Sequence, residues 1–429
     1  RRDDELHICK YNVRRSDVVA RRTFVYKKYA LRYTRTIMKC LLCRHDTAAE
    51  FLDLGMQPLA NKYPKEEHFA TEDFFPLQVL FCTSCKNVQL GTIVSRERMF
   101  EDYYYLSSVN QGLVRHFEAL AKTLADARLV VDIGSNDGIL LKPLKELGVK
   151  AIGVEPSINV SKIANDNGLE TLVSFFNADS VAEIKKKYGK ADVIVCSSVF
   201  THLEDPHQLI DDVKKLMVDD GKFIVEVEYI VNFLQQVQFE RFYFDRVFYY
   251  SLTSLQKLFE AHGMYIADVE DVNIHGGSIR VVARNKGHGK PSDRVTRLIN
   301  KEEKNLMPQT QEAFRNAVAA HTGVFKAKLS EYKKTGIRVA GYGAPARVAT
   351  ICNYGQIGPD LIEFIVDDSP LKQNRYSPGT HIPIVPRDHL EKHGADVLVV
   401  FAYEYLDDIK KKTAGKGYRY LIPIPPREV

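Results

Sequence analysis

The sequence predicts an α/β protein in which a small zinc-binding N-terminal domain precedes two lobes, each built on a parallel β-sheet. Two observations predict this class. Two pairs of cysteines stand near the N-terminus, each pair separated by two residues, and apolar strand-like runs alternate with amphipathic helical patterns in two later blocks. The chain of 429 residues, 45% of them hydrophobic, has the length of roughly two to four domains.

Composition and charge exclude several classes of protein. No window approaches the roughly 18 continuous apolar residues of a membrane span. We therefore expect no membrane partner. Seven cysteines in so long a chain do not suggest a disulfide scaffold, so we expect a reducing, cytoplasmic compartment. Residues 1–37 carry a net charge of +7, from 11 Lys/Arg and 4 Asp/Glu, so the +5 of the whole chain leaves −2 for the rest. We therefore expect no nucleic-acid partner.

The chain divides into five segments. The first, residues 1–37, is a basic extension with three readings: a genuine extension, a targeting peptide, or translated sequence before a natural start at Met38. Acidic residues at its front do not suit a transit peptide, and we favour the third reading. The others are a zinc-binding domain (38–98), an α/β domain (99–288), a helical connector (289–334) and a C-terminal α/β domain (335–429).

The zinc-binding domain is predicted from Cys40, Cys43, Cys82 and Cys85, which form two C-x2-C pairs. Each pair brings two thiolates to one side of a tight turn, and two such turns make a tetrahedral four-sulfur site that suits zinc. A site closed by four cysteines is structural rather than catalytic. The alternative is four reduced cysteines without a metal.

In the first α/β domain, strands are expected at "ARLVVDIGSNDG", "KAIGVEPS", "ADVIVCSSVF" and "GKFIVEVEYI". The stretch "VVDIGSNDGILL" leads from a strand through a glycine-bearing turn into a helix, where a ligand can approach the backbone. About 20 residues later, Glu155 stands where an acid can hydrogen-bond a ribose diol. Asp132 and Asp137 would repel a pyrophosphate, so the loop suits S-adenosylmethionine (SAM), which carries a sulfonium cation. The alternative is an ordinary strand–helix turn.

Residues 38–429 resemble, in order, the sugar-nucleotide C-methyltransferases of deoxysugar biosynthesis. The resemblance rests on the paired cysteines, "MQPLANKY", "MFEDYYYLSSVN", "VDIGSNDG", "GVEPS", "VFTHLEDP", "HGGSIR", "GYGAPAR" and "VDDSPLKQNRYSPGTHIPI". It implies a SAM-dependent Rossmann-like methyltransferase domain and a second Rossmann-like α/β domain that binds the nucleotide sugar. It also implies a structural Zn²⁺, and we expect a monomer.

The resemblance assigns residues to three roles. The expected cofactor-binding residues are Asp132, Gly134, Asn136, Asp137, Gly138, Glu155 and Ser198. The expected substrate-binding residues are His275, Gly276, Ser278, Arg280, Tyr342, Gly343, Lys372, Arg375 and Tyr376. The expected catalytic residues are His202, Tyr243, Asp245, Arg246, Tyr103, Tyr105 and Glu226. For "HGGSIR" the alternative is a β-bulge with a surface arginine, and for Lys372 to Tyr376 a solvated basic loop.

One stretch departs from the family. Where relatives carry Tyr-His-Glu-His, with the second His as the expected general base, this chain has Tyr243, Phe244, Asp245 and Arg246. Arginine is never deprotonated in a protein, so Arg246 cannot be the base. It could stabilise an enolate oxygen, grip a carboxylate, or lower the pKa of Tyr243. His202 is the first alternative base and His275 the second.

Three hypotheses about function are compatible with this departure. The first is C-methylation next to the keto group of a nucleotide-linked deoxysugar, with TDP the expected carrier. The second is an O-methyltransferase on a related acceptor, because an alcohol needs only a weak base as the methyl group moves. The third is a catalytically inactive binding protein that keeps the SAM and nucleotide-sugar sites, which the intact SAM loops disfavour.

Overall fold

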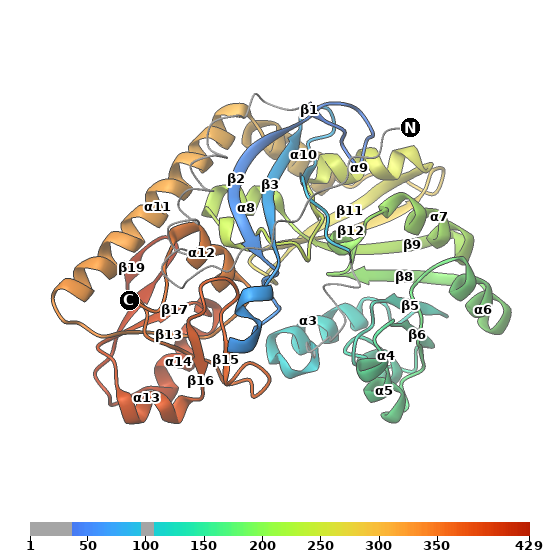
Figure 1. Cartoon of the computed structure of the whole chain (residues 1–429). Coiled ribbons are helices and arrows are strands. Elements are labelled where there is room, and N and C mark those ends of the chain that lie inside the picture. Colours follow the sequence, from blue (N-terminus) through green and yellow to red (C-terminus); the bar gives the residue numbers. More distant parts are fainter. Residues whose placement is uncertain (1–36, 96–106) are drawn as a thin grey trace, which may run out of the picture. The chain divides into compact units, whose positions relative to one another are not determined.

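The computed structural model describes residues 37–95 and 107–429, and it contains three β-sheets (Figure 1). The central and C-terminal sheets use strands that the alternation of apolar runs and polar turns predicts, whereas the N-terminal sheet was not predicted. In the part of the chain that is described, no helix combines the length and apolar character needed to cross a membrane. The α/β fold class predicted from the sequence is confirmed.

The N-terminal sheet is antiparallel and carries the cysteine pairs at one end. Its strands are β2 (Ala48–Pro58), β3 (Phe74–Cys82), β4 (Val88–Leu90) and β10 (Phe248–Tyr249), with β1 (Ile37–Met38) before them and the 3-10 helix η1 (Glu66–Thr71) between β2 and β3. Strand β10 belongs to the aromatic stretch that follows Arg246. Phe248 and Tyr249 are fully buried, so this stretch joins the N-terminal sheet to the next domain.

The central sheet has seven strands in the order β11-β12-β9-β8-β5-β6-β7. Strands β5 to β9 run parallel, and β12 runs antiparallel between β9 and β11. The strands are β5 (Val130–Ile133), β6 (Ala151–Val154), β7 (Thr171–Leu172), β8 (Ala191–Ser197), β9 (Met217–Glu228), β11 (Met264–Val272) and β12 (Ser278–Asn285). The order reverses between β5 and β8, and ligands of such sheets bind beyond the carboxyl ends of the strands at that point.

Helices accompany these strands (Figure 1). They are α3 (Gln111–Lys122), α4 (Leu141–Glu146), α5 (Ile158–Asp166), α6 (Ala178–Tyr188), α7 (Pro206–Leu216), α8 (Ile230–Gln236) and α9 (Leu252–Ala261), with the 3-10 turns η2 (Ser107–Val109), η3 (Phe200–His202) and η4 (Phe239–Arg241). The sequence suggested a helix directly after the glycine turn that follows β5. Instead, irregular turns extend to residue 140, and α4 has only six residues.

The C-terminal sheet, drawn in red in Figure 1, repeats the doubly wound pattern. Its order is β15-β16-β14-β13-β17-β18-β19, with β15 and β19 antiparallel at the edges. The strands are β13 (Val339–Tyr342), β14 (Ile365–Val366), β15 (Arg375–Tyr376), β16 (Pro383–Val385), β17 (Val397–Val400), β18 (Arg419–Ile422) and β19 (Arg427–Glu428). Its helices are α12 (Arg347–Gly355), α13 (Arg387–His393), α14 (Leu406–Lys412) and the 3-10 turn η5 (Tyr403–Tyr405).

Two helices connect the central and C-terminal sheets, α10 (Asp293–Asn305) and α11 (Pro308–Lys334). The sequence predicted one long polar helical block here. The break comes at Pro308, which occupies the first turn of α11, where its missing N–H costs nothing. Helix α11 buries an apolar stripe at helical spacing that includes Phe314, Val318, Phe325 and Leu329.

Candidate active site

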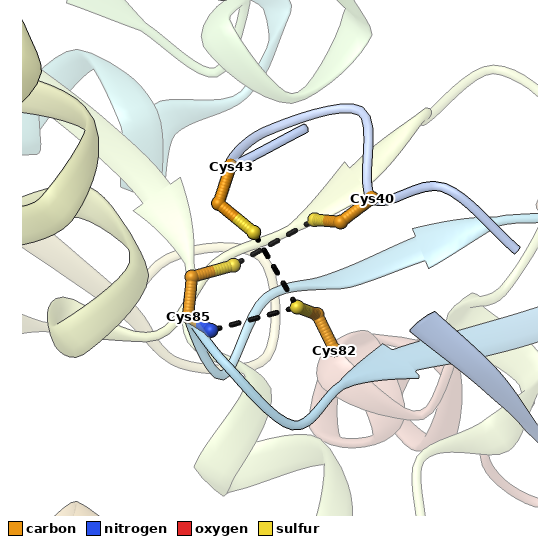
Figure 2. A group of neighbouring side chains, drawn as sticks. All are labelled: Cys40, Cys43, Cys82 and Cys85. Carbon is orange, nitrogen blue, oxygen red and sulfur yellow. Dashed lines mark hydrogen bonds between the residues drawn. The ribbon is translucent and has the colours of Figure 1, made fainter. Parts of the chain in front are cut away.

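The four cysteines of the N-terminal domain converge on one point (Figure 2). Their sulfur atoms all lie within 4.8 Å of one another, and two pairs, Cys40–Cys85 and Cys43–Cys82, are 3.6 Å apart. Tetrahedral zinc with Zn–S bonds of about 2.3 Å requires sulfurs about 3.8 Å apart. The donor set therefore fits Zn²⁺, and four thiolates leave no open position for catalysis.

Histidines outside the cysteine motif support the first metal-binding turn. His207 Nε2 lies 2.7 Å from the backbone oxygen of Leu42, which stands between Cys40 and Cys43. The other ring nitrogen of His207 lies 2.8 Å from His262, and His262 lies 2.7 Å from the Asp211 carboxylate. This chain of contacts was not predicted, because residues about 165 positions apart give no local signal.

The expected SAM loops meet at the point where the central sheet reverses its order. Asp132 is the penultimate residue of β5, Gly134 follows that strand, Glu155 follows β6, and Ser198 follows β8. Asn136, Asp137 and Gly138 lie in the turns after β5. Gly134 has φ +72°, and a Cβ atom there would lie 2.3 Å from Val199 Cγ2, so the turn requires glycine for its own packing.

The acidic groups of this loop fit a cationic ligand. Burial, and secondarily the nearby charges of Glu226 and Glu155, raises the pKa of Asp132 well above its usual value, and a cationic ligand would offset both effects. Asp137 Oδ2 accepts hydrogen bonds from Ser108, but its buried Oδ1 has no hydrogen-bond partner among the described residues. Such oxygens suit the ammonium and sulfonium charges of SAM.

Glu155 is oriented by the loop itself. Its two carboxylate oxygens accept backbone hydrogen bonds from Asn136, at 3.1 Å, and from Ser157, at 2.8 Å. A carboxylate has about four acceptor positions, so Glu155 can still accept hydrogen bonds from the hydroxyl groups of a ribose. The residues present therefore fit SAM.

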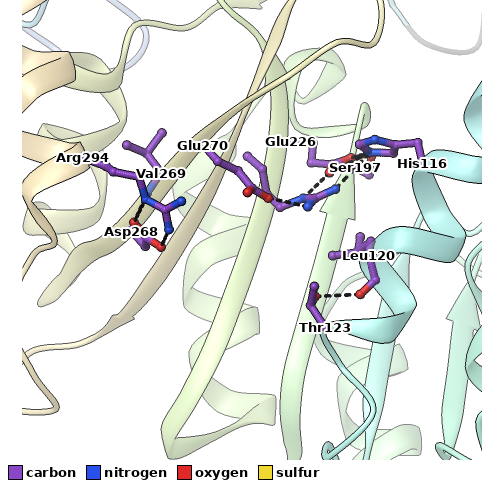
Figure 3. A network of polar contacts seen from close by, with 10 residues as sticks. His116, Leu120, Thr123, Ser197, Glu226, Asp268, Val269, Glu270 and Arg294 are labelled. Atoms are coloured by element: carbon purple, nitrogen blue, oxygen red, sulfur yellow. Dashed lines mark hydrogen bonds and ion pairs between the residues drawn. The ribbon is translucent and has the colours of Figure 1, made fainter.

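Glu226 stands at the centre of a second polar network (Figure 3). It is fully buried, yet it accepts hydrogen bonds from Ser197 Oγ, from Arg280 Nε at 2.5 Å and from His116 Nε2 at 2.9 Å. Burial alone would raise its pKa, but these partners lower it to about 2. Arg280 also pairs with Glu270, so the arginine expected to contact the substrate is held by two carboxylates.

Arg246 belongs to a third, buried cluster. Its Nη2 lies 2.5 Å from Glu228 Oε1, its Nη1 donates to the Tyr243 hydroxyl at 2.5 Å, and its guanidinium lies 4.8 Å from the centre of the Tyr243 ring. Burial alone would raise the pKa of Glu228, but Arg246 and the nearby His275 and His202 hold it below its usual value.

The sequence suggested that Arg246 lowers the pKa of Tyr243. Burial raises that pKa above its usual value and outweighs Arg246, which does favour the phenolate. Tyr243 is therefore a hydrogen-bond acceptor and ring partner for Arg246 rather than an activated base.

His202, the first alternative base, lies beside this cluster. Its Nδ1 is within hydrogen-bond distance of the Asp245 backbone oxygen. A carbonyl oxygen only accepts, so Nδ1 carries the proton and Nε2 carries the lone pair. Burial and then the positive charge of Arg246 lower the pKa of His202. The imidazole is thus held neutral, in a single tautomer.

The "HGGSIR" residues pack against the same region. His275 is close enough to Glu228 and Arg246 for their charges to act on its pKa, which burial lowers. Ser278 donates to the Ile274 backbone oxygen at 3.1 Å. A Cβ atom at Gly276, which has φ +84°, would lie 2.4 Å from Arg241 Cζ. This glycine therefore makes room for Arg241, which pairs with Glu404 of the C-terminal domain at 2.6 Å.

The remaining expected substrate residues lie in the C-terminal domain. Tyr342 ends β13 and Gly343 follows it. Lys372, Arg375 and Tyr376 contact Tyr63 and Pro64 of the N-terminal domain, at the end of the "MQPLANKY" segment. Lys372 Nζ and the Tyr63 hydroxyl both donate to the Ala344 backbone oxygen, at 3.0 and 2.7 Å. Two expected catalytic residues, Tyr103 and Tyr105, lie outside the described residues.

Three family models match this chain. The C-methyltransferase C-terminal domain matches residues 273–425, the methyltransferase domain matches residues 85–269, and a domain described as "Putative zinc binding domain" matches residues 40–100. The matches follow the order of domains along the chain.

Known proteins match over different lengths. The C-methyltransferase NovU of Streptomyces niveus is 31% identical over 409 residues, which cover 92% of this chain and 97% of NovU. A ubiquinone biosynthesis O-methyltransferase of Cupriavidus pinatubonensis is 26% identical over 128 residues, 29% of this chain and 49% of that protein. The magnesium protoporphyrin IX methyltransferase structure from Synechocystis PCC 6803 has a TM-score of 0.32 at 17% identity, over 44% of this chain and 89% of that one. That likeness is too weak to argue from.

Proposed function

Because this chain belongs to the family of SAM-dependent C-methyltransferases, we propose that it methylates the carbon next to the keto group of a nucleotide-linked deoxysugar, with TDP as the carrier. The C-terminal domain offers a second doubly wound sheet, whose switch point follows Tyr342 and Gly343. A nucleotide-sugar site there is part of the proposal.

The observation that carries the proposal is the hydrogen bond from His202 Nδ1 to the Asp245 backbone oxygen, which fixes the tautomer of the imidazole. C-methylation requires a base that removes the proton next to the ketone, and a base works best when its pKa lies near the working pH. The Asp245 carbonyl holds the Nδ1 proton of His202, which leaves the basic lone pair on Nε2, and burial and then Arg246 lower the pKa of the imidazole. SAM, when bound, supplies the electrophilic methyl group.

Arg246 then has a different task from that of the base. Loss of the proton leaves negative charge on the substrate oxygen, and a fixed positive charge nearby stabilises it. Arg246 is held by Glu228 and Tyr243, so its guanidinium needs little reorganisation as that charge develops. We thus assign proton removal to His202 Nε2 and stabilisation of the enolate to Arg246.

The test is transfer of isotopically labelled methyl from SAM to a panel of nucleotide-linked 4-keto-6-deoxysugars, with NMR of the product. A new carbon–carbon methyl is expected. An O-methyl product, or SAM binding without transfer to any acceptor, would overturn the proposal. The first of these outcomes would favour an O-methyltransferase and the second an inactive binding protein.

The base assignment is tested separately, by exchange of the substrate's α-proton with solvent deuterium while S-adenosylhomocysteine occupies the cofactor site. His202→Asn should slow exchange by a factor of about 10² to 10⁴ without weakening SAM binding. His393→Asn, which changes an exposed histidine on α13, is the matched control. Equal exchange in both variants would exclude His202 as the base.

A further inference from the structure

A short segment of the N-terminal domain, residues 59–65 between β2 and η1, contacts both larger domains. Toward the C-terminal domain, the Tyr63 hydroxyl donates to the Ala344 backbone oxygen at 2.7 Å, and the Tyr376 backbone N–H donates to Pro64 at 3.0 Å. Toward the methyltransferase domain, Asn61 Nδ2 donates to Asp245 Oδ2 at 2.6 Å. The segment therefore reaches the stretch 243–246, which contains Asp245 and Arg246.

The two ends of the Asn61–Asp245 contact differ in burial. Asp245 is only 8% exposed, whereas Asn61 is exposed. A hydrogen bond to a carboxylate is stronger than one between neutral groups, and the short distance agrees with that. Because Asn61 is exposed, replacing it should disturb the packing of the core very little, so an effect on the reaction can be separated from an effect on folding.

Asp245 carries two contacts at once. Its side chain is held by Asn61, and its backbone oxygen accepts from His202 Nδ1. The position of that backbone oxygen decides which nitrogen of His202 is protonated and where the lone pair of Nε2 points. The next residue, Arg246, is in turn paired with Glu228. Holding the Asp245 side chain therefore restrains the peptide between the base and the fixed positive charge.

We propose that Asn61 is a positioning residue of the methyl-transfer reaction. It holds the Asp245 carboxylate, and thereby the Asp245 carbonyl that fixes the tautomer and direction of His202. This inference rests on the proposed function, in which His202 is the base. It also gives the N-terminal domain a part in the reaction beyond the metal site, because the folded domain presents Asn61 to the methyltransferase domain.

The experiment compares four variants of the full-length, zinc-loaded protein. Asn61→Leu removes the donor and keeps a side chain that branches at Cγ. Asp245→Asn removes the charge of the acceptor. The double variant Asn61→Asp/Asp245→Asn restores the hydrogen bond with donor and acceptor exchanged. Lys62→Gln, an exposed neighbour in the same segment, is the matched control.

Steady-state kinetics on the active acceptor give the first result. Asn61→Leu should lower kcat by roughly a hundredfold, the cost of a small misplacement of a catalytic group, with little change in KM. The double variant should recover most of kcat, and Lys62→Gln should match the wild type. A normal kcat in Asn61→Leu, or a loss that the double variant does not recover, would overturn the proposal. So would a loss of kcat that is matched by a loss of zinc or of melting temperature.

A second result requires no acceptor, so it separates failure of this proposal from failure of the proposed function. In ¹⁵N-histidine NMR, the His202 signals are assigned among the 13 histidines by their absence in His202→Asn. The wild type should show a single tautomer protonated at Nδ1, and Asn61→Leu should show a mixture of tautomers that the double variant reverses. If no sugar is methylated but this pattern appears, the positioning role stands and the substrate assignment fails. An unchanged His202 spectrum in Asn61→Leu would overturn the positioning role.

Discussion

Replacing Glu226 by glutamine tests the electrostatics of the central sheet, because glutamine keeps the shape of the side chain and removes its charge. Glu226 is fully buried, and its partners bring its pKa from an ordinary 4.5 to about 2. The difference of about 2.5, at about 1.36 kcal/mol for each pKa unit, favours the charged form in the folded protein by about 3 kcal/mol. Glu226→Gln should therefore lower the free energy of unfolding by about 3 kcal/mol near neutral pH.

The dependence on pH has a definite sign. The folded-state pKa of Glu226 lies below the ordinary value, so its contribution is fully present above about pH 5 and is lost as the pH falls toward 2. Since Glu226→Gln lacks that contribution at every pH, the difference between wild type and variant should shrink as the pH falls.

Urea denaturation followed by far-ultraviolet circular dichroism measures this difference. Any loss of zinc in acid affects both proteins alike and cancels in the comparison. Glu67→Gln, whose side chain is 67% exposed, is the matched control and should stay within about 0.5 kcal/mol of the wild type. A Glu226→Gln difference below about 1 kcal/mol near pH 7, or one that does not change with pH, would refute the reasoning.

Three further predictions concern the other sites. Removing the metal with a chelator, or replacing Cys43 by serine, should abolish binding of one zinc per chain and lower the melting temperature, as measured by elemental analysis and thermal denaturation. Gly134→Ala should weaken SAM binding at least about tenfold in calorimetry, because the added Cβ overlaps Val199 at a left-handed backbone position. If the variant bound SAM as tightly as the wild type, the turn would have adapted to the added Cβ and the prediction would be wrong. Arg246→Met should cost about 3–5 kcal/mol by leaving Glu228 buried without its partner, and Arg246→Met/Glu228→Gln should recover most of it in the urea assay.

The parts of the fold that depend on local pattern could be predicted from the sequence. The strands at Val130–Ile133 and Ala191–Ser197 were visible as apolar runs bounded by polar turns, and the cysteine pairs defined the metal site by their spacing. The glycine turn after the first of these strands was correctly placed, but the helix after it was expected too early. Its apolar residues, such as Leu140, pack in the core as irregular turns, and the pattern does not distinguish these from a helix.

Contacts between distant segments could not be predicted in the same way. Asn61 and Asp245 are 184 residues apart, and His116 and Glu226 are 110 apart, so no periodicity or spacing connects them. The register of β12 places Arg280 opposite Glu226, and the Arg241 side chain lies against Gly276. Neither neighbour could be inferred from the sequence, and the substrate roles expected for Arg280 and Gly276 stay predictions.

In the proposed mechanism, the tasks of base and anion binder fall to two residues, His202 and Arg246. A single histidine that accepts the proton becomes positive only after the proton has moved. Arg246 is positive throughout, and its charge lowers the pKa of His202; under the proposal it would also favour negative charge on the substrate oxygen. The arrangement requires the buried Glu228 carboxylate to hold Arg246 in place and the backbone oxygen of Asp245 to hold His202. The four residues act as one unit, so the loss of any one should impair proton removal more than it impairs SAM binding.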